Sequence, residues 1–159
     1  MINQQMPALE LGSKGYSCAQ MLIIGALRLL KRENPDLTRA LGGLAQGAGC
    51  GELCGALSGG VCLLSLYTGK GWDAESPDPK VKLLIHELTE WFALDVCNGK
   101  GVTCDAILAT VTEGDALSAQ DKQRMCENYC IGLVIKVWEK SLSLLQRHGF
   151  DLTRGREPE

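Results

Sequence analysis

The chain lacks an excess of positive charge. Its 159 residues include 16 Lys and Arg against 19 Asp and Glu, for a net charge of -3. Binding to phosphate backbones needs clustered Lys and Arg, so we expect no nucleic-acid partner. The longest apolar runs, 19–30 and 53–66, are shorter than the roughly 20 residues that cross a bilayer. They predict buried helices and no membrane span.

A secretory leader is also missing. The first 17 residues, MINQQMPALELGSKGYS, contain no positive region followed by an apolar core. We therefore expect a cytoplasmic protein. In a reducing compartment, cysteines serve metal binding, catalysis or redox sensing more often than structural bridges.

The familiar cysteine motifs are absent too, although the chain has eight cysteines. The close separations are C-x3-C at 50–54 and 126–130, C-x7-C at 54–62 and C-x6-C at 97–104. None is the C-x2-C of zinc ribbons, thioredoxin-like motifs or bacterial ferredoxins. Any metal site must therefore combine cysteines from distant segments.

What the chain has is helical periodicity. Apolar residues recur at helical spacing, and no segment alternates apolar and polar residues as a half-buried strand does. The spacing predicts helices over about 17–34, 37–44, 54–68, 79–92 and 118–148. We predict an all-α fold, a bundle of about five helices with glycine-rich connecting loops.

The length of the chain favours one domain. We expect residues 1–159 to form a single helical, cysteine-rich domain. Its core would span 15–148, and the tail 149–159 would be frayed.

The stretch 47–62, GAGCGELCGALSGGVC, combines cysteines with glycines. Gly55 and Gly59 lie one turn apart in the predicted helix. Glycine inside a helix costs about 1 kcal/mol relative to alanine. We therefore expect a neighbouring helix or a cofactor to pack very close to this part of the backbone.

Cys18 and Cys54 occupy predicted first turns, where the partial positive charge of a helix N-terminus favours the thiolate. Cys104 and Cys130 can reach them only through tertiary folding. Four thiols that meet inside a bundle can bind an iron–sulfur cluster or zinc, or cycle between dithiol and disulfide. A single cysteine can also pack as a small hydrophobe. Eight core fillers would not favour helix starts and glycine-rich loops.

The residues Cys54-Gly55-Ala56-Leu57-Ser58-Gly59 resemble the CGAxxG core of a redox-active protein family called C_GCAxxG_C_C. Further segments resemble its other cysteine positions: Ser17-Cys18-Ala19-Gln20, Val102-Thr103-Cys104-Asp105 and Cys130-Ile131-Gly132-Leu133-Val134. The similarity spans about 15–145.

The resemblance implies that Cys18, Cys54, Cys104 and Cys130 form the functional set. Around a cofactor we expect five further positions: Gly55, Gly59, Cys50, Cys97 and Cys126. In this alignment Cys97 is an alternative to Cys104, and Cys126 is an alternative to Cys130. Cys62 is a further addition to the family pattern.

Three hypotheses follow. In the first, an iron–sulfur cluster on the four cysteines carries electrons to a redox protein partner. A metal-free variant of this hypothesis uses disulfide exchange, in which Cys54 attacks a substrate disulfide and a second cysteine resolves the mixed disulfide. The second is a zinc or copper binding module. The third is a structural interaction domain whose Gly55 and Gly59 pack against a twin subunit, as a homodimer.

Overall fold

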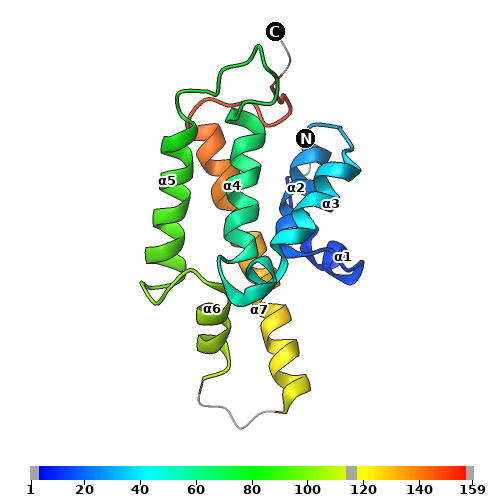
Figure 1. Cartoon of the computed structure of the whole chain (residues 1–159), viewed down its shortest axis with the longest axis vertical. Helices are drawn as coiled ribbons and strands as arrows, with labels where there is room; N and C mark the ends of the chain where they lie inside the picture. The colour runs from blue at the N-terminus through cyan, green and yellow to red at the C-terminus, as the bar shows by residue number, and fades with distance from the viewer. Residues whose placement is uncertain (1–3, 114–117, 157–159) are drawn as a thin grey trace.

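The computed structural model describes residues 4–113 and 118–156 of the chain. In this part, seven α-helices and three shorter helical turns account for the regular structure, with no strand (Figure 1). In chain order they are α1 (Ala8–Ser13), α2 (Cys18–Leu29), α3 (Pro35–Leu41), η1 (Gly42–Leu44), η2 (Gly47–Gly51), α4 (Gly55–Thr68), α5 (Val81–Trp91), η3 (Phe92–Val96), α6 (Cys104–Val111) and α7 (Ala119–Arg147).

The predicted all-α class is confirmed, whereas the predicted number of about five helices is too low. The two unexpected helices are α1 and α6, of 6 and 8 residues. Both are shorter than the window of about 11 residues over which helical periodicity can be recognised.

The helix α4 is the centre of the bundle. It contains no charged residue, as is typical of a helix surrounded by others. It packs against α2, α5 and α7 (Figure 1). The largest fully buried side chains of the core are Phe92, Leu11, Leu22, Ile23, Leu57, Leu63, Leu64, Leu84, Leu88, Leu144, Leu145 and Val134.

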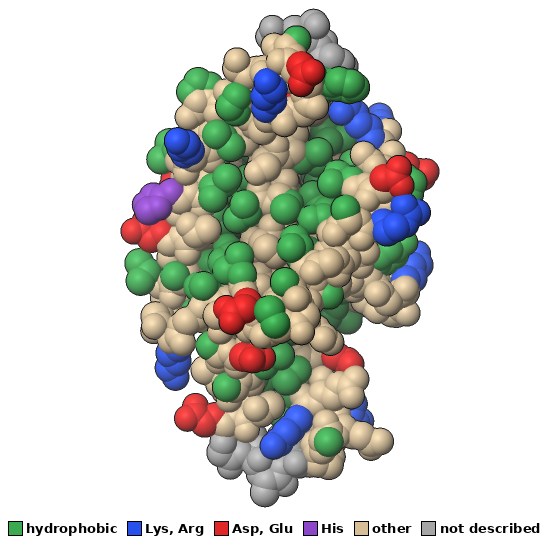
Figure 2. All heavy atoms as spheres, viewed as in Figure 1, with side chains coloured by type: hydrophobic (Ala, Val, Ile, Leu, Met, Phe, Trp, Pro, Cys, Tyr) green, Lys and Arg blue, Asp and Glu red, His purple; other side chains and the backbone are tan. Residues whose placement is uncertain are grey.

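Figure 2 shows the molecule in the view of Figure 1. Hydrophobic side chains are spread over the middle of this face, some Asp and Glu side chains lie just below them, and most Lys and Arg side chains lie toward the edges. Despite this apolar character, no helix in the described ranges combines the length and hydropathy needed to span a bilayer.

Close helix packing explains the glycines of α4. A Cβ atom at Gly59 would lie 2.6 Å from Cα of Ala19, and one at Gly55 would lie 3.5 Å from Cβ of Cys18. The close neighbour predicted from these glycines is therefore α2. Since α2 of the same chain covers Gly59, this position is not free to pack against a twin subunit, and the third hypothesis is wrong on this point.

Capping residues set the helix starts. The side chain of Gln20 accepts a hydrogen bond from the amide of Ser17 at 3.0 Å, in a capping box at the start of α2. Helix α2 ends before the predicted 34 because Lys31 has a left-handed backbone, with φ of 52°. The next helix is capped by Asn34, whose side chain accepts a hydrogen bond from the amide of Leu37 at 3.0 Å.

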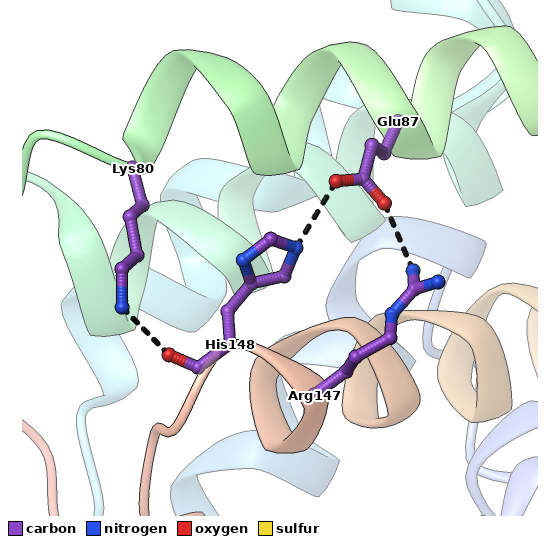
Figure 3. A network of polar contacts seen from close by, with 4 residues as sticks. All are labelled: Lys80, Glu87, Arg147 and His148. Atoms are coloured by element: carbon purple, nitrogen blue, oxygen red, sulfur yellow. Dashed lines mark hydrogen bonds and ion pairs between the residues drawn. The ribbon is translucent and has the colours of Figure 1, made fainter.

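A polar network joins α5 to the C-terminal end of α7 (Figure 3). The carboxylate of Glu87 pairs with the guanidinium of Arg147 at 2.8 Å and with Nε2 of His148 at 3.0 Å. The ammonium of Lys80 donates to the carbonyl of His148 at 2.8 Å. His148 therefore serves helix packing.

The sequence analysis predicted a frayed tail, but its described part, 149–156, packs against the bundle. The hydroxyl of Tyr67 donates to the carbonyl of Leu152 at 2.8 Å, and Leu152 is only 5% exposed. The guanidinium of Arg156 donates to the carbonyls of Thr68 and Gly69 at 3.1 and 2.9 Å. Residues at the C-terminal end of α4 thus bind a segment for which the sequence pattern predicted no contact. Residues 157–159 lie outside the described range.

Candidate functional site

Three helices of the bundle begin at a cysteine. Cys18 is the first residue of α2, Cys54 is the N-cap of α4, and Cys104 is the first residue of α6. The unpaired amide groups of a helix start carry partial positive charge, which stabilises a thiolate. The start of α6 at Cys104 was not visible in the sequence pattern.

A short antiparallel bridge places two of these helix starts side by side. Leu53 and Thr103 pair as an isolated β-bridge. Around it, the amide of Cys54 donates to the carbonyl of Val102 at 2.9 Å, and the amide of Cys104 donates to the carbonyl of Glu52 at 2.6 Å. Cys54 and Cys104 are therefore neighbours through backbone bonds.

The segment 46–51 shapes the approach to this bridge. Its backbone is left-handed at Gln46, Gly47, Ala48, Gly49 and Gly51. At Gly51, with φ of 76°, a Cβ atom would overlap the carboxylate of Asp105. Glycine at this position lets the loop lie against the first turn of α6, directly beside Cys104.

The fourth cysteine of the family pattern comes from α7. Hydrogen bonding couples the side chains of Cys130 and Cys18. This bond lowers the pKa of Cys18, against the opposing effects of burial and of the neighbouring Cys54 and Cys104. The same bond, together with burial, raises the pKa of Cys130. Cys18 is thus the favoured thiolate, and Cys130 is its proton-bearing partner.

The other two thiols of the set, Cys54 and Cys104, have a higher pKa than an ordinary cysteine. Burial raises the pKa of Cys54, which is only 5% exposed, although the amides of Leu57 and Ala56 act in the opposite direction. Burial also raises the pKa of Cys104, and the charges of Cys130 and Asp105 add to the effect. The structure therefore brings the four predicted cysteines within electrostatic range of one another.

The remaining cysteines divide into two groups. Cys97 lies near Cys54, and Cys126 lies near both Cys130 and Cys104, so these two border the set. Cys50 is exposed, and its thiol donates to the carbonyl of Gly47 at 3.3 Å. Cys62 lies in the middle of α4, and its pKa is raised by burial alone. No other thiol contributes to the pKa of Cys62.

Comparison with protein families gives a match over residues 16–143, which includes the four cysteines and the bridge. The matching family is described as "Putative redox-active protein (C_GCAxxG_C_C)". The chain belongs to this family. The family description supports a redox role for the cysteines, and the resemblance seen in the sequence is confirmed. Neither the curated proteins nor the solved structures provide a match.

One residue that the sequence analysis missed adjoins the C_GCAxxG_C_C cysteines. Tyr129 is 36% exposed, and its pKa is raised by burial and by the charges of Cys97, Cys130 and Cys54. Together with Cys97 and Lys100 it lines a cavity of about 90 Å³. Its position immediately before Cys130 is the signal that could have singled it out.

The side chains do not form a ready metal site. Among the described residues, which include all eight cysteines and both histidines, no group of three or more His, Cys, Asp or Glu has an arrangement that could hold a metal ion. An iron–sulfur cluster or zinc on the four thiols stays a prediction. What the side chains do provide is a neighbouring pair of thiols, Cys18 and Cys130, whose pKa values shift in opposite directions.

Proposed function

We propose that this protein performs reversible dithiol–disulfide exchange, in which Cys18 is the attacking thiolate and Cys130 is the resolving thiol. The observation that carries the proposal is the coupling of the Cys18 and Cys130 side chains, which lowers the pKa of Cys18 and raises that of Cys130. Two neighbouring sulfur atoms need only a limited movement to form a disulfide bond.

The environment of Cys18 suits an attacking thiol. The thiolate is the reactive form, and a lowered pKa increases its population near neutral pH. Cys18 begins α2 and is partly exposed, so a substrate sulfur can approach it. Cys54 is less suited to the attacking role that the sequence suggested, because it is buried and its pKa is raised.

The exchange has two steps. First, the Cys18 thiolate attacks one sulfur of a substrate disulfide; a mixed disulfide forms, the substrate S–S bond breaks, and the other substrate sulfur leaves as a thiolate that takes a proton from solvent. Cys130 then loses its proton to solvent and attacks the sulfur of Cys18. The protein disulfide forms, and the first substrate sulfur leaves and is protonated. The substrate gains two electrons from the protein and two protons from solvent; Cys130 returns one proton to solvent, and Cys18 released the other when it formed its thiolate.

The proposal is tested by oxidising the reduced protein in buffers of defined dithiol–disulfide ratio and mapping the disulfide by peptide mass spectrometry. We expect a two-electron transition and a Cys18–Cys130 disulfide. Cys18→Ser should abolish the transition, whereas Cys62→Ser is the matched control and should leave it unchanged, because Cys62 contacts no other thiol of the set. An unchanged transition in Cys18→Ser would overturn the proposal.

The iron–sulfur cluster and the zinc or copper module remain predictions, and no step above depends on a metal. Protein prepared without oxygen separates them from disulfide exchange. Disulfide exchange predicts a colourless protein without stoichiometric iron, zinc or copper. Visible absorption with stoichiometric iron that Cys18→Ser removes would instead favour electron transfer through a cluster.

A further inference from the structure

Two large, partly exposed side chains border the cysteine set. Leu53 precedes Cys54 in the chain, pairs with Thr103 in the β-bridge, and is 44% exposed. Tyr129, on α7, is 36% exposed and also lies near Cys54, whose charge contributes to its raised pKa. Apolar surface that stays in water beside a reactive group often marks the place where a partner binds. The thiols therefore adjoin a surface that a partner can cover.

Two exposed carboxylates lie on either side of Leu53 and its bridge. Glu52 precedes Leu53, and its carbonyl accepts a hydrogen bond from the amide of Cys104 at 2.6 Å. Asp105 follows Cys104, and its carboxylate lies where a Cβ atom of Gly51 would be. Over residues 4–113 and 118–156, neither carboxylate forms an ion pair. Both are therefore available to cations of a partner.

A third exposed carboxylate, that of Glu127, lies on the α7 side of the set. Its charge raises the pKa of Cys126 and Cys130. Lys100 lies in the loop before α6 and Lys122 lies on α7, but in the described part of the chain no Lys or Arg contributes to the pKa of either thiol. Where α4 and α6 begin in Figure 1, Figure 2 shows Asp and Glu side chains among hydrophobic ones. The charged side chains that act on these thiols are therefore acidic.

These exposed side chains together form a docking face: Leu53, Tyr129, Glu52, Asp105 and Glu127. We infer that the docking face binds a protein segment that is rich in Lys or Arg and carries the substrate disulfide. The inference rests on the disulfide exchange proposed above and names its class of substrate. Opposite charges speed the encounter of two partners and fix their orientation. Apolar contacts then hold the segment while the Cys18 thiolate attacks its disulfide.

A protein segment fits the docking face better than a small cationic disulfide does. The side chains of the docking face come from three places in the chain: the connection before α4, the first turn of α6 and the middle of α7. An extended segment can contact all three places at once. The cavity beside Tyr129 has a volume of only about 90 Å³, whereas pockets for small molecules occupy roughly 300 to 1,000 Å³.

The test compares three peptides that share one internal disulfide and differ only in the flanking residues, which are Lys, Ser or Glu. Reduced protein is mixed with each peptide, and formation of the Cys18–Cys130 disulfide is followed by acid quench and peptide mass spectrometry. Each rate is divided by the rate of the same peptide with dithiothreitol, because flanking charge also changes the reactivity of the disulfide itself.

We expect the Lys peptide to react at least about fivefold faster than the Ser peptide, the factor that corresponds to about 1 kcal/mol of surface ion pairing. The Glu peptide should be the slowest of the three. The preference should shrink in about 0.5 M salt, where exposed charges are screened within a few ångströms.

Variants of the docking face locate the effect. Glu52→Gln with Asp105→Asn should reduce the preference for the Lys peptide over the Ser peptide to less than about twofold. Leu53→Ala should slow all three peptides, because it shortens an exposed apolar side chain. Glu90→Gln on α5 is the matched control, since it removes the same charge from an exposed position outside the docking face. The small neutral reagent 2-hydroxyethyl disulfide should react equally with every variant, which shows that the thiols are intact.

The outcomes separate this inference from the exchange on which it rests. Equal normalised rates for the Lys and Glu peptides, with the Cys18–Cys130 disulfide still forming, would overturn the inference and leave the exchange intact. No such disulfide with any reagent would overturn the exchange and the inference together. Cystamine, a small cationic disulfide, is the last arm. A normalised rate equal to that of the Lys peptide would indicate a small cation as substrate and would overturn the assignment of a protein.

Discussion

Gly59 lies against the backbone of Ala19, the residue that follows Cys18. A Cβ atom at Gly59 would be 2.6 Å from Cα of Ala19 and 2.9 Å from Cδ1 of Leu22. Real Cβ contacts are longer, so the approach of α4 to α2 depends on the missing side chain. The family motif thus has a packing role at its last position, in addition to the chemistry of Cys54.

We predict that Gly59→Ala destabilises the protein. The added methyl group would force α4 and α2 apart, and overpacking of this kind typically costs about 1 to 3 kcal/mol. Urea unfolding of the reduced variant should show the loss as a lower midpoint. Because Ala19 adjoins Cys18, the variant should also change the rate at which Cys18 is alkylated.

Gly132→Ala is the matched control for this prediction. Gly132 also lies within a helix, α7, but a Cβ atom there would meet no atom within 4 Å. Only the gain in helix propensity then remains, which is up to about 1 kcal/mol. We expect a higher unfolding midpoint. A similar loss of stability in both variants would contradict the packing argument.

The hydrogen bond from Cys130 predicts how Cys18 reacts as pH changes. In the wild type, Cys18 should be alkylated by iodoacetamide at a lower pH than an ordinary thiol, whose pKa is about 8.5. Cys130→Ala should raise the pKa of Cys18, because the largest lowering effect would be removed while burial and the charges of Cys54 and Cys104 would remain. Peptide mass spectrometry over a range of pH measures this.

Two further variants sharpen this measurement. Cys50→Ser should serve as the background, since Cys50 is exposed and would consume reagent. Cys130→Ser keeps a hydroxyl donor and should restore part of the lowered pKa. An identical pH profile for Cys18 in the Ala and Ser variants and in the background protein would show that the bond has no effect.

The stability of the reduced protein should fall at alkaline pH. Burial raises the pKa of Tyr67 to about 12. It also raises the pKa of five thiols: Cys54, Cys62, Cys97, Cys104 and Cys126. The pKa of a sixth thiol, Cys130, is raised by hydrogen bonding with Cys18 and by burial. The folded state therefore holds these protons more tightly than the unfolded state. The resulting stability is complete below the unfolded thiol pKa, about 8.5, and is lost as pH rises through the folded values.

The lowered pKa of Cys18 acts in the opposite direction, but it is one group against six other thiols. Urea midpoints measured at increasing pH from neutral should decrease. Cys62→Ala should make this decrease less steep, because it removes one thiol whose pKa is raised by burial alone. Midpoints that rise with pH would contradict the assignment of protonated thiols.

The contact between Tyr67 and the tail gives a separate prediction. Tyr67→Phe removes the donor to the carbonyl of Leu152, which lies 85 positions away in the chain. Loss of a buried hydrogen bond typically costs about 1 kcal/mol. Amide exchange should increase over 150–156, whereas exchange in α2 should not change. Unchanged exchange in the tail would show that Arg156 alone is sufficient to hold it.

Much of the fold followed from signals that act within one or two turns. The predicted helices over 17–34 and 118–148 start within one residue of α2 and α7, which begin at Cys18 and Ala119. The predicted helix over 54–68 agrees with α4 because Gly69 ends it. The helices α1 and α6 were missed because a segment of 6 or 8 residues shows little periodicity. The docking of 149–156 was missed because its partners lie far away in the chain.

The sequence by itself determined that the protein is helical and that Cys18 and Cys54 occupy helix starts, because capping and periodicity involve residues within a few positions of one another. The tertiary structure alone decided which thiols meet. The one-residue bridge of Leu53 and Thr103 places Cys104 beside Cys54. The packing of α7 against α2 brings Cys130 to Cys18. A hydrogen bond between thiols, and the unequal pKa values that it causes, depend on distance in space rather than on separation along the chain.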